Sequence, residues 1–88
     1  MFTIEIDGLG VEVSEFVCQP TPPHRDVKLR FRCASPDFDP PLEALIVFRD
    51  RHSWYRGMFR RIACTIEPNL KNYMYWSLGP VVTDPSKR

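Results

Sequence analysis

Apolar and polar side chains alternate along residues 2–13, which predicts a β-hairpin. Asp7-Gly8 stands in the middle of this stretch, and it favours the two-residue turn in which both residues have a positive φ. All the apolar side chains then fall on one face, and a slip of one residue would expose half of them. Phe16-Val17 breaks the alternation, which predicts a bulge or the end of the second strand. The predicted pairs are Phe2 with Val13, Ile4 with Val11, and Ile6 with Leu9.

The same alternation recurs over residues 27–33 and predicts a half-buried strand whose outer face is entirely basic. Lys28, Arg30 and Arg32 form this outer face. If the strand neighbours the first hairpin, we expect these cations to face the acidic side chains of the hairpin. Such cross-strand pairs contribute about 0.2–1 kcal/mol each. The predicted inward side chains are Val27, Leu29, Phe31 and Cys33.

Residues 42–49 fit two kinds of element. Asp39-Pro40 resembles the start of a helix, because aspartate caps helices and proline is tolerated in the first turn. Residues 45–48 are instead a continuous apolar run, Leu-Ile-Val-Phe, which suits a strand that is buried on both faces. A strand is favoured, and a short helix near residues 41–50 remains the alternative.

The second half of the chain predicts two further strands. Residues 50–57 are polar and aromatic, which indicates a loop, and residues 59–67 read as a strand with Cys64 on its core face. Residues 68–72 indicate a turn before an aromatic strand over residues 73–78. If Met74, Trp76 and Leu78 of that last strand point inward, Tyr73 and Tyr75 point outward, as suits an interface. The alternative is that the two tyrosines pack against a neighbouring strand or the connection over residues 19–24.

Together these elements predict a mostly β protein, a small antiparallel barrel or sandwich of five to six strands. The domain is expected to span residues 1–82, and residues 83–88 are expected to form a flexible tail. The nine prolines fall largely in clusters that mark the connections between strands. A chain of 88 residues buries only about 60–70% of its unfolded surface, so its core is thin.

Charge is nearly balanced over the whole chain but is unevenly distributed along it. The formal net charge of +1 gives no general attraction to nucleic acid or to an anionic membrane. Residues 1–19 carry four acids and no base, whereas residues 25–61 carry nine bases and five acids. The molecule is therefore a dipole along its sequence, and the fold decides whether it is one in space.

Three cysteines without close pairing argue against a disulfide scaffold and predict reduced thiols in a cytoplasm, either of the producing cell or of a host cell. The first residues lack a signal-peptide pattern, and no apolar run is long enough to span a bilayer. We expect no metal site, because zinc ligands usually come in close pairs and none is present here. The candidate ligands are Cys18, His24, Cys33, His52 and Cys64.

No catalytic motif and no phosphate-binding glycine loop is present, so we expect neither an enzyme nor a cofactor. The most distinctive segment is residues 48–61, which combines arginines with aromatic residues. Trp, Tyr and Arg dominate protein–protein hot spots, and the same residues can stack on bases and contact phosphates. Alternatively, Trp54 and Phe59 cap the core while the arginines pair with the acidic hairpin. The candidate binding residues are Arg49, Arg51, Trp54, Tyr55, Arg56, Arg60 and Arg61, extended by Tyr73 and Tyr75.

The sequence therefore predicts a small non-enzymatic module that binds another protein. This size class is typical of accessory proteins of phages and mobile elements, including inhibitors or modulators of host proteins. A nucleic-acid-binding barrel that uses residues 48–61 is the alternative, and its affinity would fall steeply with salt. A third option is a virion or other structural subunit that self-associates through an unpaired strand edge. No membrane partner is expected, and a homo-oligomer is left open.

Overall fold

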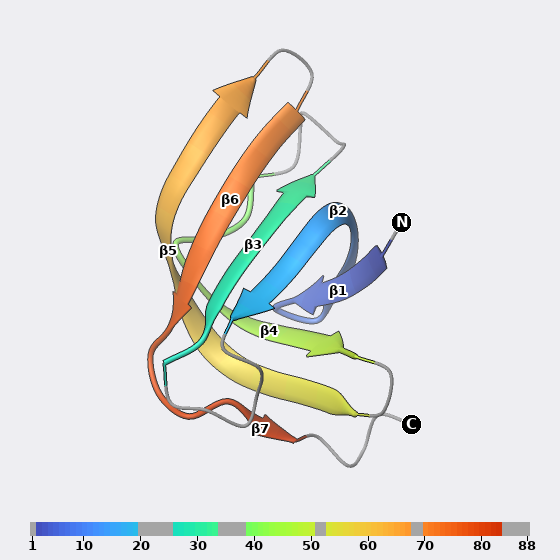
Figure 1. Ribbon diagram of the computed structural model, residues 1–88, viewed down its shortest axis with the longest axis vertical. Helices are drawn as coiled ribbons and strands as arrows, with labels where there is room; N and C mark the ends of the chain where they lie inside the picture. The colour runs from blue at the N-terminus through green and yellow to red at the C-terminus, as the bar shows by residue number, and fades with distance from the viewer. Residues whose placement is uncertain (1, 20–25, 34–38, 51–52, 68–69, 84–88) are drawn as a thin grey trace.

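The computed structural model describes residues 2–19, 26–33, 39–50, 53–67 and 70–83, which form seven strands and no helix. Six of the strands close into an antiparallel barrel, and the short β7 adds to one side of β5 (Figure 1). This confirms the predicted small antiparallel barrel, and the stretch 42–49 is a strand, not a helix. The strands are β1 (Phe2–Ile6), β2 (Leu9–Gln19), β3 (Lys28–Cys33), β4 (Glu43–Arg49), β5 (Trp54–Glu67), β6 (Leu70–Ser77) and β7 (Val82–Thr83).

The barrel is built from two three-stranded meanders, β1–β2–β3 and β4–β5–β6, which join along two seams. At one seam β3 and β6 pair along six register positions, from Lys28–Trp76 to Cys33–Lys71. At the other seam β1 and β4 share two register pairs, Glu5–Val47 and Ile6–Ile46. Since the order around the barrel is β1-β2-β3-β6-β5-β4, the two seams lie on opposite sides of it.

The first hairpin has the predicted register, with Phe2 opposite Val13 and Ile6 opposite Leu9. Asp7 and Gly8 form the turn with φ values of 52° and 84°, both in the left-handed region that this kind of turn requires. The turn is also tied to β4. The Asp7 amide donates to the Leu45 carbonyl oxygen at 2.8 Å, and the Leu45 amide donates to Asp7 Oδ1 at 2.8 Å. The turn therefore helps to close the barrel.

The irregularity predicted near Phe16-Val17 is a β-bulge in β2. The register with β3 shifts between Ser14 and Val17, and Glu15 has a φ of 52°. The bulge restores the inward direction of the strand, so Phe16 packs against Phe2 and Phe48, with ring centroids 5.0 and 5.4 Å away.

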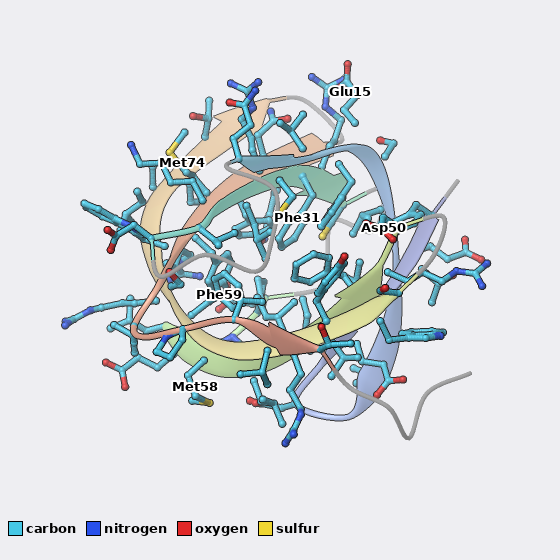
Figure 2. All side chains as sticks on the ribbon, turned by 60° about the horizontal axis from the view of Figure 1, so that its bottom comes forward. Glu15, Phe31, Asp50, Met58, Phe59 and Met74 are labelled. Carbon is cyan, nitrogen blue, oxygen red and sulfur yellow. The ribbon has the colours of Figure 1, made fainter. Side chains whose placement is uncertain are left out.

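Aromatic rings fill the interior of the barrel. Phe31 lies at the centre, with ring centroids 5.9 Å from Tyr73 and 5.8 Å from Tyr75. Figure 2 shows Phe31 and Phe59 inside the ring of strands, with Met58 and Met74 outside it. Large rings suit this space because each removes much apolar surface from water. The buried apolar residues are Ile4, Ile6, Val11, Val13, Val27, Leu29, Phe31, Cys33, Ala44, Ile46, Val47, Phe48, Tyr55, Phe59, Tyr73, Tyr75 and Val81.

The predicted orientation of β6 is wrong. Tyr73 and Tyr75 are 1% and 0% exposed, whereas Trp76 is 43% exposed on the outer face. The cause is the pairing with β3, which places the two tyrosines opposite the inward residues Phe31 and Leu29. Burial of Tyr75 leaves no polar atom unsatisfied, because its hydroxyl donates to the Pro41 carbonyl oxygen at 2.7 Å.

Three boundaries also differ from the expectation. The loop predicted over residues 50–57 is shorter, because β5 begins at Trp54 and pairs with β4 from there. The predicted turn 68–72 is shorter too, since β6 already begins at Leu70. Cys64, expected in the core, is exposed, although it is the register partner of the buried Tyr73. Of the expected tail, Thr83 belongs to β7 and residues 84–88 lie outside the described residues.

We predict that Gly8→Ala lowers the free energy of unfolding by about 1 kcal/mol, because a Cβ disfavours a φ in the left-handed region. Gly79→Ala is the matched control, since Gly79 lacks a positive φ and has open space around it. The control should be neutral or stabilising by about 0.4–1 kcal/mol. Urea unfolding followed by circular dichroism measures both, and equal effects would contradict the turn geometry.

Stability should fall at alkaline pH. Burial raises the pKa of Tyr73 from 10 to about 12, so between these values the unfolded chain loses a proton that the folded protein keeps. The free energy of unfolding is then expected to decrease as the pH rises from about 10 toward 12. Tyr73→Phe removes this ionisation, and its urea midpoint should decline less steeply between pH 9 and 11.5. An unchanged slope would show that Tyr73 does not contribute.

Candidate functional site

The seam between β1 and β4 opens toward the start of β1 and the end of β4. Residues 2–4 of β1 pair with β2 but have no register partner in β4. Phe48 and Arg49 of β4 pair only with Tyr55 and Trp54 of β5. The two strands diverge from their common pairs toward the N-terminal end of β1 (Figure 1). The barrel is therefore closed at one end of this seam and splayed at the other.

An apolar cleft of about 370 Å³ lies on the inner side of the splayed seam. Most of its wall is aromatic, and the ring of Phe48 packs 5.4 Å from Phe16 and 5.6 Å from Tyr55. The charged residues Arg49 and Asp50 stand at its edge. Such a cleft can take an apolar side chain of a ligand. The lining residues are Phe2, Phe16, Cys18, Phe48, Arg49, Asp50 and Tyr55.

A second cleft, of about 400 Å³, lies on the outer side of the same seam. It is more polar, since Thr3, Glu5 and Arg49 line it together with Phe2 and Trp54. Phe2 and Arg49 line both clefts, so the two hollows meet at the unpaired stretch of β1. The seam thus offers an apolar recess on one face of the sheet and a polar, charged recess on the other.

Arg49 and Trp54 form the rim between the clefts. They are register partners at the β4–β5 hairpin, and the Arg49 guanidinium carbon lies 5.5 Å from the centroid of the indole ring. A cation over the face of a tryptophan is attracted by its π electrons. This contact orders both side chains before any partner arrives, which lowers the entropy cost of binding.

Asp50 fixes the hairpin at the edge of the inner cleft. Its Oδ1 accepts a hydrogen bond from the Ser53 amide at 2.9 Å, and its Oδ2 accepts one from the Tyr55 hydroxyl at 3.0 Å. The Tyr55 ring is buried, and this burial is the main reason that the pKa of its hydroxyl is raised. Tyr55 is therefore a wall of the cleft held by Asp50, and not the exposed loop residue that the sequence predicted.

The other predicted binding residues are dispersed. Arg60 lies 3.8 Å from Glu43, and Arg61 lies 3.4 Å from Asp39 and donates to the Pro40 carbonyl oxygen at 3.0 Å. Arg61 and Tyr75 thus hold residues 39–41 at the end of the barrel where β4 begins. Tyr73 is inside the core, Arg56 is exposed on β5, and Arg51 lies outside the described residues. Among the described candidates, the structure brings Arg49, Trp54 and Tyr55 together at the β1–β4 seam, and Arg61 and Tyr75 together where β4 begins.

Sequence reasoning missed the aromatic lining of the inner cleft. Phe2 was assigned to the hairpin core, and Phe16 was seen only as a break in the alternation. That break was the available signal, because a bulge redirects a side chain and often lies beside a functional site. Nothing in the sequence indicated that Phe2, Phe16 and Phe48 meet, since they come from three different strands.

Burial, and then the charge of Asp50, raise the pKa of the Cys18 thiol to about 11, so this thiol stays protonated and is a poor nucleophile at neutral pH. Within the described ranges, no group of three or more His, Cys, Asp or Glu side chains is placed to hold a metal ion. The described part of the chain also has no helix long and apolar enough to cross a membrane.

We predict that iodoacetamide at pH 8 labels Cys64 well before Cys18. Cys64 is exposed, whereas a thiol with a pKa of about 11 is thiolate in only about one molecule in a thousand at that pH. Peptide mass spectrometry over time distinguishes the sites, and labelling of the unfolded protein in urea is the control. Equal labelling rates in the folded protein would contradict the raised pKa of the Cys18 thiol.

Comparison with known proteins adds no identity to this geometry. No family model matches the chain, and no match was found among the curated proteins or the solved structures. The function is therefore inferred from the residues and their arrangement.

Proposed function

We propose that this protein is a non-enzymatic module that binds an extended segment of another protein in the seam between β1 and β4. The observation that carries the proposal is the pair of clefts on the two faces of an incompletely paired seam. A bound strand projects successive side chains to opposite faces of a sheet. One side chain would enter the aromatic inner cleft, and the next would enter the polar outer cleft.

The backbone of β1 supports an extended partner. Residues 2–4 face the splayed seam without a register partner in β4, and exposed strand edges of this kind bind peptides by adding a strand. Main-chain hydrogen bonds then supply affinity, and the alternating recesses supply specificity. We infer a partner segment with an apolar side chain for the inner cleft and a charged or polar neighbour for the outer one, where Glu5 and Arg49 stand.

The rim residues have the composition of an interface centre. Tryptophan and arginine are enriched among the few residues that dominate protein–protein binding energies, and Arg49 and Trp54 are already in contact with each other. The nucleic-acid alternative over residues 48–61 has less support, because the arginines of this segment do not share one surface: Arg49 lies at the β1–β4 seam, whereas Arg61 lies beside Asp39 where β4 begins. Arg49 and Trp54 are therefore the best-supported part of the segment singled out in the sequence.

The proposed setting is the cytoplasm of a producing or host cell. The free thiols of Cys18, Cys33 and Cys64 support it, because disulfides are rare where thiols are kept reduced. An accessory protein of a phage or mobile element that modulates a host protein in this way fits the size of the chain, and we propose it as the biological role.

The test is a selection of binders from a random-peptide library displayed on phage. Enriched peptides should share an apolar residue beside a polar or charged one, and should bind the purified protein in fluorescence anisotropy. Trp54→Ala and Arg49→Ala should each weaken binding, and the tryptophan variant by about 2 kcal/mol or about thirtyfold. Met58→Ala, at an exposed apolar position outside both clefts, is the matched control and should bind normally.

Two results would reject the proposal. Peptides that bind Trp54→Ala and Arg49→Ala as tightly as the wild type would place the site elsewhere. Concentration-dependent dimerisation in sedimentation experiments that Trp54→Ala abolishes would show that a second copy of this chain occupies the seam, as expected for a structural subunit.

A further inference from the structure

We propose that the opposite side of the barrel is a second binding surface, which takes single-stranded nucleic acid. The surface, called the basic face here, consists of Lys28, Arg30 and Arg32 of β3, Met74 and Trp76 of β6, and Arg60 of β5. It is centred on the fully paired β3–β6 seam, whereas the proposed peptide site lies at the β1–β4 seam. The two surfaces are therefore separate and can be tested separately.

The sheet register places the cations in rows around the aromatic side chain of β6. Arg60 of β5, Trp76 of β6 and Lys28 of β3 are successive register partners, so they share one row on the outer face. Met74 and Arg30 form the next row. Cations two residues apart along β3 are separated by about 6.6 Å, which is close to the distance between successive phosphates of an extended single strand.

The acids of β1 and β2 neutralise only part of this strand, contrary to the expectation from the sequence: Arg32 pairs with Glu15 of β2, whereas Lys28 and Arg30 have no acidic register partner on β2. The β2 partners of Lys28, Arg30 and Arg32 are Gln19, Val17 and Ser14, and none is acidic. Glu12 instead faces Thr3 on the other side of β2. The dipole seen along the sequence thus persists in space, with acids on β1 and the first part of β2 and bases on β3.

The ion pairs that the described residues make on the basic face lie at its edges. At one edge, the guanidinium of Arg32 lies 2.9 Å from the carboxylate of Glu15 at the bulge, and its Nε donates to Asn72 Oδ1 at 2.8 Å. At another edge, the guanidinium of Arg60 lies 3.8 Å from the carboxylate of Glu43. In the described portion of the chain, no acidic side chain forms an ion pair with Lys28 or Arg30. The middle of the face therefore carries positive charge that a polyanion would neutralise.

Trp76 gives the surface a preference for unstacked bases. Its side chain is 43% exposed although it is a large apolar ring, and Lys28 Nζ lies 5.2 Å from the ring centroid. An exposed aromatic ring beside cations is the arrangement on which single-strand binders stack bases while they contact the backbone. A duplex keeps its bases stacked, and the aspartate and glutamate side chains of an acidic peptide have no flat ring to stack on Trp76.

Hollows border Arg30 along the strand direction. The bulge of β2 opens one of about 430 Å³, whose lining includes Val17, Arg30, Arg32 and Asn72 and also the acidic Glu15, which pairs with Arg32. A smaller one of about 90 Å³ lies between Gln19, Lys28, Arg30 and Met74. Arg30 lines both hollows, so a chain that follows β3 can seat groups on either side of it.

The proposal is tested with a fluorescein-labelled dT15 oligonucleotide by anisotropy in low salt. We expect dT15 to bind, with about three phosphate contacts to the single strand. A plot of the logarithm of the binding constant against the logarithm of the salt concentration should then have a slope of about −2. A tenfold rise in salt should then weaken binding about a hundredfold. Arg30→Ala should weaken it and reduce the slope by about 0.7.

Trp76→Ala tests stacking and should weaken binding of dT15 about five- to 150-fold with little change in the salt slope. Arg56→Ala is the matched control. Arg56 is an exposed arginine of β5, and its register partners are Val47 of β4 and Val82 of β7, away from the basic face. It should leave binding unchanged. Trp54→Ala should also leave it unchanged, which separates this proposal from the peptide site.

Three outcomes would overturn the assignment. The first is no binding of dT15 at 20 mM salt by folded protein. The second is competition by polyglutamate as effective as that by unlabelled dT15, which would reveal a site for any polyanion. The third is tighter binding of a DNA duplex than of dT15, together with an unaffected Trp76→Ala variant.

Discussion

Closure of the barrel across the β1–β4 seam is the constraint on which the rest of the structure depends. Among the described residues, two register pairs and two hydrogen bonds between Asp7 and Leu45 make this join. They bring the start of one meander beside the start of the other, so that the rings of Phe2, Phe16 and Phe48 can meet. A barrel closed over so short a length must splay where the pairing ends, and the clefts of the proposed peptide site form there.

The packing of the interior determines which side chains of β3 and β6 lie on the outer surface. Phe31, Tyr73 and Tyr75 occupy the centre of the barrel, so the alternate positions of β3 and β6 must face solvent. Lys28, Arg30 and Trp76 are therefore outside because their neighbours are inside. The same packing separates the two proposed surfaces, since the full width of the core lies between the opposite seams.

Much of the architecture was predictable because it rests on local patterns. The hairpin over residues 2–13 needs only its alternation and the Asp7-Gly8 turn, and the bulge beyond it appears as a break in that alternation. The candidate site was predictable in part. Arg49 and Trp54 meet because they are close in sequence across a hairpin, whereas the aromatic lining comes from four strands, and only the break in alternation at Phe16 gave a local signal of it.

The sequence by itself determined the class of fold, the inward faces of β1 and β3, and the register of the first hairpin, because each follows from a period of two and from turn residues. Only the tertiary structure decided the orientation of β6, since Tyr73 and Met74 are both apolar enough for a core and their neighbours in β3 select between them. It also decided which charges are neutralised. Pairing between strands distant in sequence sets which side chains face each other, and no local pattern encodes that pairing.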